Sequence, residues 1–417
     1  MSPGGATTMP RFPRLALAAL RLLLVAALLS TLSASAAALW VIFTDHYPSH
    51  VCDLQISPDG SVLALALSGG DCTWVLLCDA RSGTELRSAQ LTTGRPLWVK
   101  ISMDCNTWAA LFDGGCLELG RLASGERRRA QLPERLWDSY LGGVSGDGTI
   151  CAVGGGVRVA VIDVETARDV AQFTAPATRP GRLWSLSVRA DGRQVAAAFD
   201  NTVEVNGRQE WQSGIAVWDI SNGTLLKRLP AGVVSLTRLA WVGEDAIAGL
   251  NCGSVDGPAE PITLRSVATG KTRVLAQEVR SQLFGPFNPG SSFGGALCAA
   301  ADATALATDF GQADLAVLDA ATLRPKYPRL RSMGVDADLL AASDGGAQVA
   351  CAYGHTPGVF VADMQGGAVR QLRPHRNNVP RILAVVAIGG VLVAGCLWLL
   401  ARTVRRRGSA PSGEPAK

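Results

Sequence analysis

Histidine is scarce in this sequence, which limits the chemistry that the chain can carry. Its 417 residues include four histidines, His46, His50, His355 and His375. Three of the four lie next to long apolar runs, so the middle of the chain has little material for a histidine metal site or a histidine-activated nucleophile. The GxSxG motif, the CxxC pair and the CxxCH haem motif are all absent. We therefore predict no catalytic residue, no metal site and no cofactor.

A strong excess of one charge is also missing from the middle of the chain. Residues 51–373 contain 29 basic and 33 acidic side chains. Nucleic-acid binding needs a basic surface that neutralises phosphates, so we predict no nucleic-acid partner. The ten cysteines have no regular spacing. They fit small buried hydrophobic side chains, although an oxidising exterior would permit one or two disulfides.

Two long apolar runs, residues 22–43 and 382–401, contain no charged residue. Each has the length needed to cross a bilayer as a helix. Arginines flank the outer end of each run, and the positive-inside rule then places both chain ends in the cytoplasm. The first run has an alternative as a cleavable signal peptide, because Ala-Ser-Ala occurs at 34–36. The predicted division is a basic cytoplasmic segment at 1–21, a transmembrane helix or signal peptide at 22–43, an extracytoplasmic domain at 50–375, a transmembrane helix at 381–401 and a disordered basic cytoplasmic tail at 402–417.

Between the two runs, one pattern recurs seven times as a strand, a short polar turn and a second strand. The copies are "VLLCDARSGTELR" (75–87), "LELGRLASGERRR" (117–129), "VAVIDVETARDVA" (159–171), "IAVWDISNGTLLK" (215–227), "ITLRSVATGKTRV" (262–274), "LAVLDAATLRPKY" (315–327) and "VFVADMQGGAVRQ" (359–371). Five copies have an aspartate at the first turn position, namely Asp79, Asp163, Asp219, Asp319 and Asp363. An aspartate there can accept hydrogen bonds from backbone N–H groups two residues on, so we predict a structural role for these five carboxylates.

A second unit precedes each copy. It is a strand, a polar turn and an Ala/Val-rich strand, as in "LQISPDGSVLALAL" (54–67). Period-two alternation and small-residue turns favour antiparallel strands. Each repeat therefore supplies about four strands, and successive turns lie 42, 42, 56, 47, 53 and 44 residues apart, which is typical of β-propeller blades. The predicted fold is all-β, a seven-bladed β-propeller flanked by one transmembrane helix at each end, in which residues near 50 and 373 are neighbours.

The "SPDG…LA…VWD…TG" pattern resembles the WD40 repeat family over about three quarters of the chain. The family's Trp-Asp dipeptide is present as Trp218-Asp219, and a second pair, Trp137-Asp138, falls elsewhere in its repeat. The family's Gly-His dipeptide does not precede the first strands, since Gly354-His355 lies between strands of the seventh blade. The repeats are therefore similar to degenerate WD40-like blades of a bacterial membrane-anchored type. This resemblance implies a rigid ring that presents loops to partners.

The function that we expect from these features is a membrane-anchored scaffold without catalytic activity, which binds a protein or senses a ligand on the extracytoplasmic side of the cell membrane. The alternative is an extracytoplasmic propeller enzyme of the lyase, lactonase or quinoprotein type. Such enzymes need polar or metal-binding groups that converge on the central channel, and the sequence shows no such cluster.

Three long connections predict where the working surface lies. They are residues 200–213, 251–261 and 279–295, in the fourth and fifth blades and leading into the sixth. All three would emerge on one face of the ring, and extra length on a connection is where binding tends to occur on a rigid scaffold. Aromatic residues are common interface anchors, although each could instead pack against its own loop. The aromatic residues predicted for this face are Trp98, Trp184, Trp211, Phe284, Phe287 and Phe293.

Overall fold

The computed structural model describes residues 50–69, 72–91, 96–136, 141–177, 181–205, 208–232, 236–251, 262–275, 296–309, 315–330, 337–352 and 359–372, together with single helical positions at 387, 391, 394, 395, 398 and 402. The chain divides into two compact units, Tyr47–His375 and the pair of terminal segments Met1–His46 and Arg376–Lys417. In the part of the chain that is described, no helix combines the length and hydrophobicity that a bilayer crossing requires. The predicted spans at 22–43 and 381–401 lie outside the described residues, apart from helical positions in the second.

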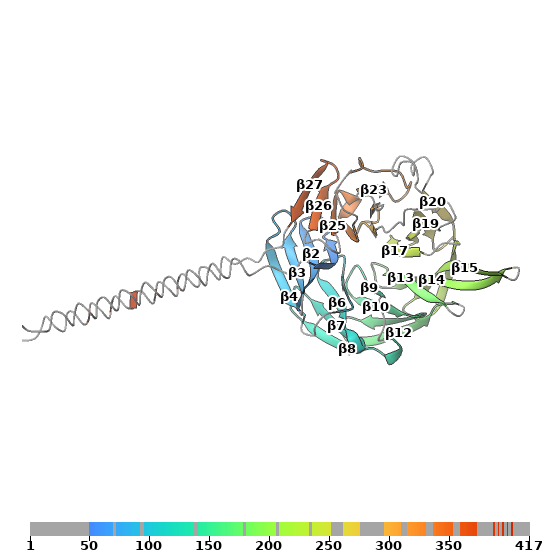
Figure 1. Ribbon diagram of the computed structural model, residues 1–417, viewed down its shortest axis with the longest axis horizontal. Helices are drawn as coiled ribbons and strands as arrows, with labels where there is room; N and C mark the ends of the chain where they lie inside the picture. The colour runs from blue at the N-terminus through green and yellow to red at the C-terminus, as the bar shows by residue number, and fades with distance from the viewer. Residues whose placement is uncertain are drawn as a thin grey trace, which may run out of the picture. The chain divides into compact units, whose positions relative to one another are not determined.

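The unit Tyr47–His375 is a ring of antiparallel sheets, each built from consecutive strands (Figure 1). Blade one contains β1 (His50–Ile56), β2 (Val62–Gly69), β3 (Cys72–Asp79) and β4 (Glu85–Gln90). Blade two contains β5 (Trp98–Ile101), β6 (Thr107–Leu111), β7 (Cys116–Arg121) and β8 (Arg127–Gln131). Blade three contains β9 (Leu141–Val144), β10 (Ile150–Gly155), β11 (Arg158–Asp163) and β12 (Arg168–Thr174). Blade four contains β13 (Arg182–Val188), β14 (Gln194–Val205), β15 (Arg208–Asp219) and β16 (Leu225–Gly232).

The remaining three blades repeat this order. Blade five contains β17 (Leu236–Val242), β18 (Ala246–Asn251), β19 (Ile262–Ser266) and β20 (Thr272–Val274). Blade six contains β21 (Leu297–Ala299), β22 (Ala305–Asp309) and β23 (Leu315–Asp319), and blade seven contains β24 (Leu339–Ala342), β25 (Gln348–Ala352), β26 (Val359–Asp363) and β27 (Ala368–Leu372). Three short 3₁₀ helices are η1 (Asp113–Gly115), η2 (Glu134–Leu136) and η3 (Asp344–Gly346). The predicted seven-bladed propeller is confirmed. In blade six the described fourth-strand region makes two bridges to β23, Leu315–Leu330 and Leu318–Pro325.

Each blade buries both faces against its neighbours. In β2, Leu63, Leu65 and Leu67 pack with blade seven, whereas Ala64 and Ala66 pack with blade two, because successive side chains of a strand point to opposite faces. The described residues form seven buried clusters, one between each pair of adjacent blades. This double burial is the reason why the middle strands read as continuous apolar runs while the outer strands, such as β4 and β8, are mostly exposed.

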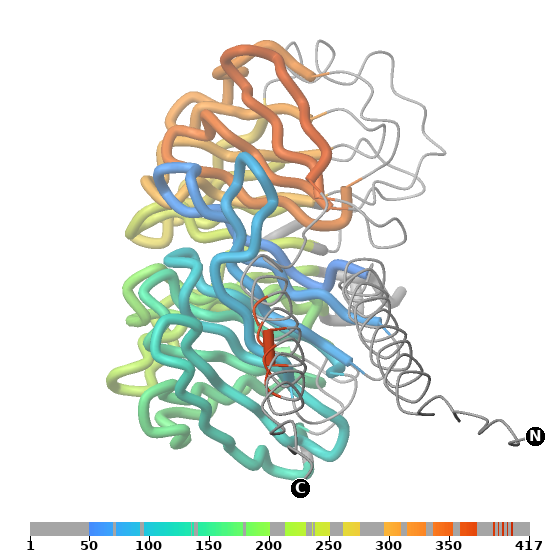
Figure 2. Tube along the Cα trace, turned by 90° about the vertical axis from the view of Figure 1, so that its left-hand side faces the viewer, coloured from blue at the N-terminus to red at the C-terminus, as the bar shows by residue number. Residues whose placement is uncertain are grey.

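The ring closes by packing of blade one on blade seven. The innermost strands β1, β5, β9, β13, β17, β21 and β24 contact one another in that order, and β24 contacts β1. Val51 and Leu372 belong to the same buried cluster, which confirms that residues near 50 and 373 are neighbours. Figures 1 and 2 both show the blue strands of blade one beside the orange-red strands of blade seven. Since every described sheet has consecutive strands, the closure involves side-chain packing and no exchange of strands within the described residues.

The prediction that residues 200–213 form a loop was wrong. Strands β14 and β15 remain paired from Gln194 opposite Asp219 to Val205 opposite Arg208. Strand β14 pairs with β13 only as far as Asp200, and β15 pairs with β16 only from Ser213, which lies opposite Gly232. The extension beyond these residues is therefore a two-stranded ribbon, which projects from the ring in Figure 1. Strand-forming residues alternate along this segment, and Asn-Gly at 206–207 is the sequence most typical of a two-residue hairpin turn. Residues 252–261 and 279–295 lie outside the described residues.

The direction of the chain gives the ring two distinct faces. The turns from first to second strands and from third to fourth strands form one face, which we call the turn face, and they gather on the left of Figure 2. The connections from second to third strands and from each blade to the next lie on the opposite face. Strand β1 begins at His50 and β27 ends at Leu372 on that opposite face, which we call the exit face. Both ends of the propeller therefore leave the ring from one side.

Candidate interaction surfaces

The turn between the third and fourth strands closes in the same way in five blades. In blade four, Asp219 Oδ1 accepts hydrogen bonds from the N–H groups of Ser221 (2.8 Å) and Asn222 (3.3 Å) and from the Ser221 hydroxyl (2.5 Å). Gly223 follows with a φ of +72°, a conformation that favours glycine. The other aspartates that accept N–H bonds in this way are Asp79, Asp163, Asp319 and Asp363. A turn-closing geometry thus accounts for the recurrence of aspartate at this position.

Blades two and five lack that aspartate but keep the backbone hydrogen bond that closes this turn in the other five blades. In blade five, Ser266 Oγ accepts a bond from the Thr269 N–H (3.1 Å), and the Ser266 hydroxyl donates to Asp245 (2.6 Å) in the preceding turn. In blade two, the N–H of Gly125 donates to the carbonyl of Arg121 (2.9 Å). Because backbone bonds close this turn, the Arg121 guanidinium is available for a contact outside its own blade.

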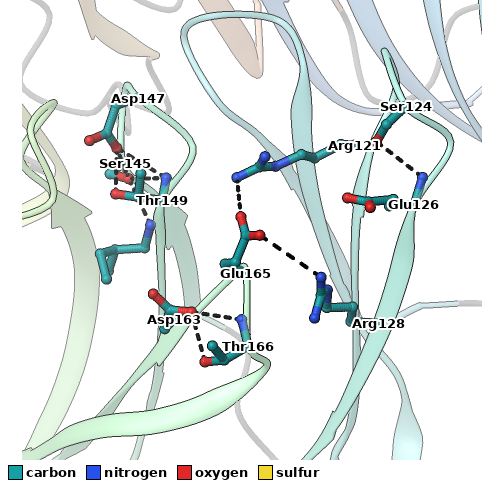
Figure 3. Close-up of polar contacts among 11 residues, drawn as sticks. Arg121, Ser124, Glu126, Arg128, Ser145, Asp147, Thr149, Asp163, Glu165 and Thr166 are labelled. Carbon is teal, nitrogen blue, oxygen red and sulfur yellow. Dashed lines mark hydrogen bonds and ion pairs between the residues drawn. The ribbon is translucent and has the colours of Figure 1, made fainter.

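Arg121 makes that contact across the boundary between blades two and three, as Figure 3 shows. Its Nη2 lies 3.0 Å from Glu165 Oε2, while Arg128 Nη2 lies 4.0 Å from Glu165 Oε1. The three side chains line an open recess together with Leu119, Gly120, Glu126 and Val164. The Glu165 side chain is 59% exposed, so these ion pairs are weak in water. The recess can help to hold two blades in register, but it does not enclose a small molecule.

The turns between the first and second strands also use aspartate. In blade one, Ser57 donates to Asp59 Oδ1 (2.5 Å), which also accepts the Ser61 N–H (3.0 Å). The hydrogen bond from Ser57, followed by those from Ser61, lowers the pKa of Asp59 to about 2. Figure 3 shows the same arrangement in blade three with Ser145 and Asp147. The Asp59 carboxylate therefore stays ionised well into the acid range.

The turns of the turn face have an excess of acidic side chains. These turns are residues 57–61, 79–84, 102–106, 121–126, 145–149, 163–168, 189–193, 219–224, 243–245, 266–271, 300–304, 319–324, 343–347 and 363–368, and they contain fifteen acidic and seven basic side chains. The pKa is lowered, mainly by a hydrogen bond from the same turn, at Asp79 with Ser82, Asp219 with Ser221 and Asp319 with Thr322. The turn face is consequently a negative surface, on which Asp79, Asp219 and Asp319 keep their charge on mild acidification.

A second group of aspartates is buried. Asp53 on β1 is 5% exposed, and its Oδ1 lies 3.0 Å from Lys100 Nζ while its Oδ2 accepts the Ile101 N–H (2.8 Å). Burial raises the pKa of Asp53, and the ammonium of Lys100 opposes that effect. Asp309 accepts a bond from the Ala337 N–H, which joins blade six to blade seven in the same manner. These carboxylates fasten one blade to the next, in contrast to those of the turn face.

The exit face includes one of the predicted aromatic residues among the described side chains. Trp184 is half-buried near the start of β13, and its Nε1–H donates to the buried Asp200 (2.6 Å). The guanidinium of Arg182 lies 3.4 Å from the centroid of the Trp184 ring, a cation–π arrangement. These contacts hold the indole in one orientation at the rim of the exit face.

Trp98 does not lie on the surface that was predicted for it. Its side chain is 8% exposed and belongs to the buried cluster between blades two and three. A Cβ at Gly142 would lie 2.6 Å from its ring, so the bare backbone of the facing strand makes room for the indole. Trp211 lies in β15, but its side chain is outside the described residues. Phe284, Phe287 and Phe293 also lie outside them.

Redox and metal chemistry find little support in the described part of the chain. No three His, Cys, Asp or Glu side chains there lie close enough together to hold a metal ion. The eight described cysteines are free thiols, of which Cys72 is exposed. Burial raises the pKa of Cys105 and Cys151 to about 12, so neither thiol ionises readily.

Sequence reasoning missed the contacts that Asp53 and Arg121 make between blades, although each left a signal. Asp53 is a charged residue inside an otherwise apolar strand, and carboxylates are rarely buried unless they are paired. Arg121 stands where five other blades have aspartate, and its departure from the repeat marks the contact with Glu165. The partners Lys100 and Glu165 have no such mark, because only the packing of the ring brings them close.

Comparison with protein-family models and with curated proteins gives no match. Among solved structures, the propeller resembles a chain of hydrazine synthase from Kuenenia stuttgartiensis, with a TM-score of 0.52 and 15% sequence identity. The similarity covers 78% of this chain and 96% of that chain. At this identity the likeness shows the fold alone, and it assigns no activity to this protein.

Proposed function

We propose that this protein is a membrane-anchored propeller that serves as a non-catalytic scaffold for protein partners on the extracytoplasmic side of the membrane. The observation that carries the proposal is a closed seven-bladed ring bracketed by two charge-free apolar runs, 22–43 and 382–401. Arginines outside both runs favour cytoplasmic chain ends, which leaves the ring on the other side. A resemblance to WD40 repeats adds the role of a rigid platform, by analogy of fold.

The packing of the ring supports a platform rather than a moving device. Buried clusters join every pair of adjacent blades, and the Asp53–Lys100 pair adds a polar fastening between blades one and two. Well-packed interiors deform little, so partners meet a surface of constant shape. Catalytic activity would require polar side chains that converge on a cavity. The polar side chains of the described residues instead make their contacts within turns and between blades.

Anchoring and sidedness are tested with the full chain in cells. Alkaline extraction should leave the protein in the membrane pellet. Cys72 is an exposed natural thiol, so a small, charged, membrane-impermeant reagent should label it on intact cells, with Cys72→Ser as the matched control. Asn222→Cys in the Cys72→Ser background provides a second reporter on the opposite face. Labelling of both reporters only after lysis would place the propeller in the cytoplasm and contradict the proposal.

The scaffold role is tested by cross-linking in intact cells followed by purification of the full chain. We expect a reproducible set of partners that depends on the propeller. The control chain retains residues 1–46 and 376–417 and lacks the ring. Recovery of the same partners with this control would assign binding to the terminal segments and overturn the scaffold role of the propeller.

A further inference from the structure

Resting on the proposed anchoring, we propose that the exit face of the propeller lies against the phospholipid headgroups and that the turn face is directed away from the bilayer. The first observation is topological. Six of the sheets have four strands each, and in blade six the chain returns along β23 through the Leu315–Leu330 and Leu318–Pro325 bridges, so β1 begins and β27 ends on the same face. Val51 and Leu372 share one buried cluster, which keeps the two exit points close together at the boundary of blades one and seven.

The connector to the first apolar run is too short to allow the opposite orientation. Six residues, 44–49, separate Phe43 from His50, and a fully extended chain of that length reaches about 25 Å. Strand β1 is the innermost of its blade. A connector from its start to the turn face would cross three strand spacings, about 14 Å, and then descend a seven-residue strand, about 24 Å. A path of about 38 Å exceeds the reach, so the N-terminal anchor holds the exit face toward the membrane.

The distribution of charge favours the same orientation. The turns of the turn face contain fifteen acidic and seven basic side chains, so anionic headgroups would repel that face. The exit face has no such excess among its described exposed side chains, which include the basic Arg158, Arg182 and Arg238 and the acidic Asp113, Glu134 and Asp338. The acidic face is thus presented to the surroundings and the more balanced face to the lipid.

Trp184 is the described side chain best suited to the headgroup region. It combines a half-buried indole with the guanidinium of Arg182 stacked 3.4 Å from its ring centroid. Tryptophan is enriched at membrane–water interfaces because it is both apolar and polar.

Quenching by a lipid-tethered quencher distinguishes the two orientations. The full chain in the Cys72→Ser background receives one reporter thiol, either Asp113→Cys between β6 and β7 on the exit face or Asn222→Cys between β15 and β16 on the turn face. Both positions are exposed. Each variant is labelled with the same fluorophore and reconstituted in phospholipid vesicles whose headgroups carry the quencher, and the signal of the Cys72→Ser parent is subtracted.

We expect at least threefold stronger quenching at position 113 than at position 222. Equal quenching, or stronger quenching at 222, in protein that floats with the vesicles overturns the orientation and leaves the anchoring intact. A difference that occurs only in native membranes, and not in pure lipid vesicles, assigns the exit face to a membrane protein and overturns the lipid contact. Protein that does not float with the vesicles overturns the proposed membrane anchoring, and the proposed orientation of the exit face is then overturned as well.

Discussion

Aspartate has opposite environments in two regions of this propeller. On the turn face, Asp59 and Asp219 are near the surface, accept bonds from their own turns and have a lowered pKa. Between blades one and two, Asp53 is buried, its partners come from the next blade and its pKa is raised by burial. The same side chain therefore closes a local loop in one region and fastens separate sheets in the other. The difference in environment predicts different costs of removal.

Asp53→Ala should have the largest effect. The substitution leaves the buried Ile101 N–H without its acceptor and removes the partner of Lys100, whose side chain is 33% exposed, and an unsatisfied buried donor together with the lost charged hydrogen bond costs about 2 to 3 kcal/mol. Chemical denaturation measures the loss in the free energy of unfolding. The matched control is Asp59→Ala in the same blade, which should lose about 1 kcal/mol. Equal losses in the two variants would remove the distinction between the two regions.

Asp219→Ala should have an intermediate effect of about 1 kcal/mol, as is usual for lost side-chain hydrogen bonds to the backbone. Binding of partners should persist, since the residue closes a turn and touches no ligand. Thermal unfolding and the cross-linking assay are measured on the same preparation. Lost partner capture with an unchanged melting temperature would give Asp219 a functional role in place of a structural one.

The pH dependence of stability should reflect the turn aspartates. The pKa of Asp59 is about 2 in the folded protein and 3.8 ordinarily, so the unfolded chain takes up its proton first as the pH falls. The stabilising contribution of Asp59 is therefore complete above about pH 4 and is lost toward pH 2. Comparison of melting temperatures over this range should show a smaller acid-induced decrease in Asp59→Asn than in the unsubstituted protein. A decrease of the same size in both would exclude this contribution.

The smallest effect is expected at the contact between Arg121 and Glu165. A double-mutant cycle with Arg121→Ala and Glu165→Ala should give a coupling free energy below about 0.5 kcal/mol, because the Glu165 side chain is 59% exposed and the Arg121 side chain 35% exposed, so solvent screens their charges. Raising the salt concentration should reduce this coupling free energy further. A coupling above 1 kcal/mol would show that this contact belongs with the buried fastenings between blades and not with the surface.

Much of the fold was predictable because the repeat depends on residues that are close together in the sequence. The turn at Asp219 requires residues within four positions of one another, and Leu63 and Ala64 alternate along one strand. Such patterns recur along the chain, with the turn aspartate in five of seven copies, so seven blades and their order could be read from the chain. The loop expected at 200–213 was wrong because only the pairing of β14 with β15 distinguishes a ribbon from an irregular connection.

The candidate surfaces were harder to predict. Trp98 and Trp184 both enter first strands, yet the first is packed over Gly142 of the next blade and the second is fixed at the rim by Asp200. Nothing adjacent to either residue in the sequence separates these outcomes. The facing blade decides whether each indole is buried, because an indole fits between two blades only where the facing strand has no side chain in that position.

The sequence by itself determined the repeat, the number of blades and the local closure of the turns, since these depend on residues a few positions apart. The tertiary structure alone decided which charged residues meet across blades, which aromatic side chains are buried and that both ends of the propeller leave from one face. These features depend on contacts between residues about fifty positions apart, such as Asp53 with Ile101, and on the ring bringing Val51 to Leu372. Only the closed ring, in which each blade packs on two neighbours, brings such residues together.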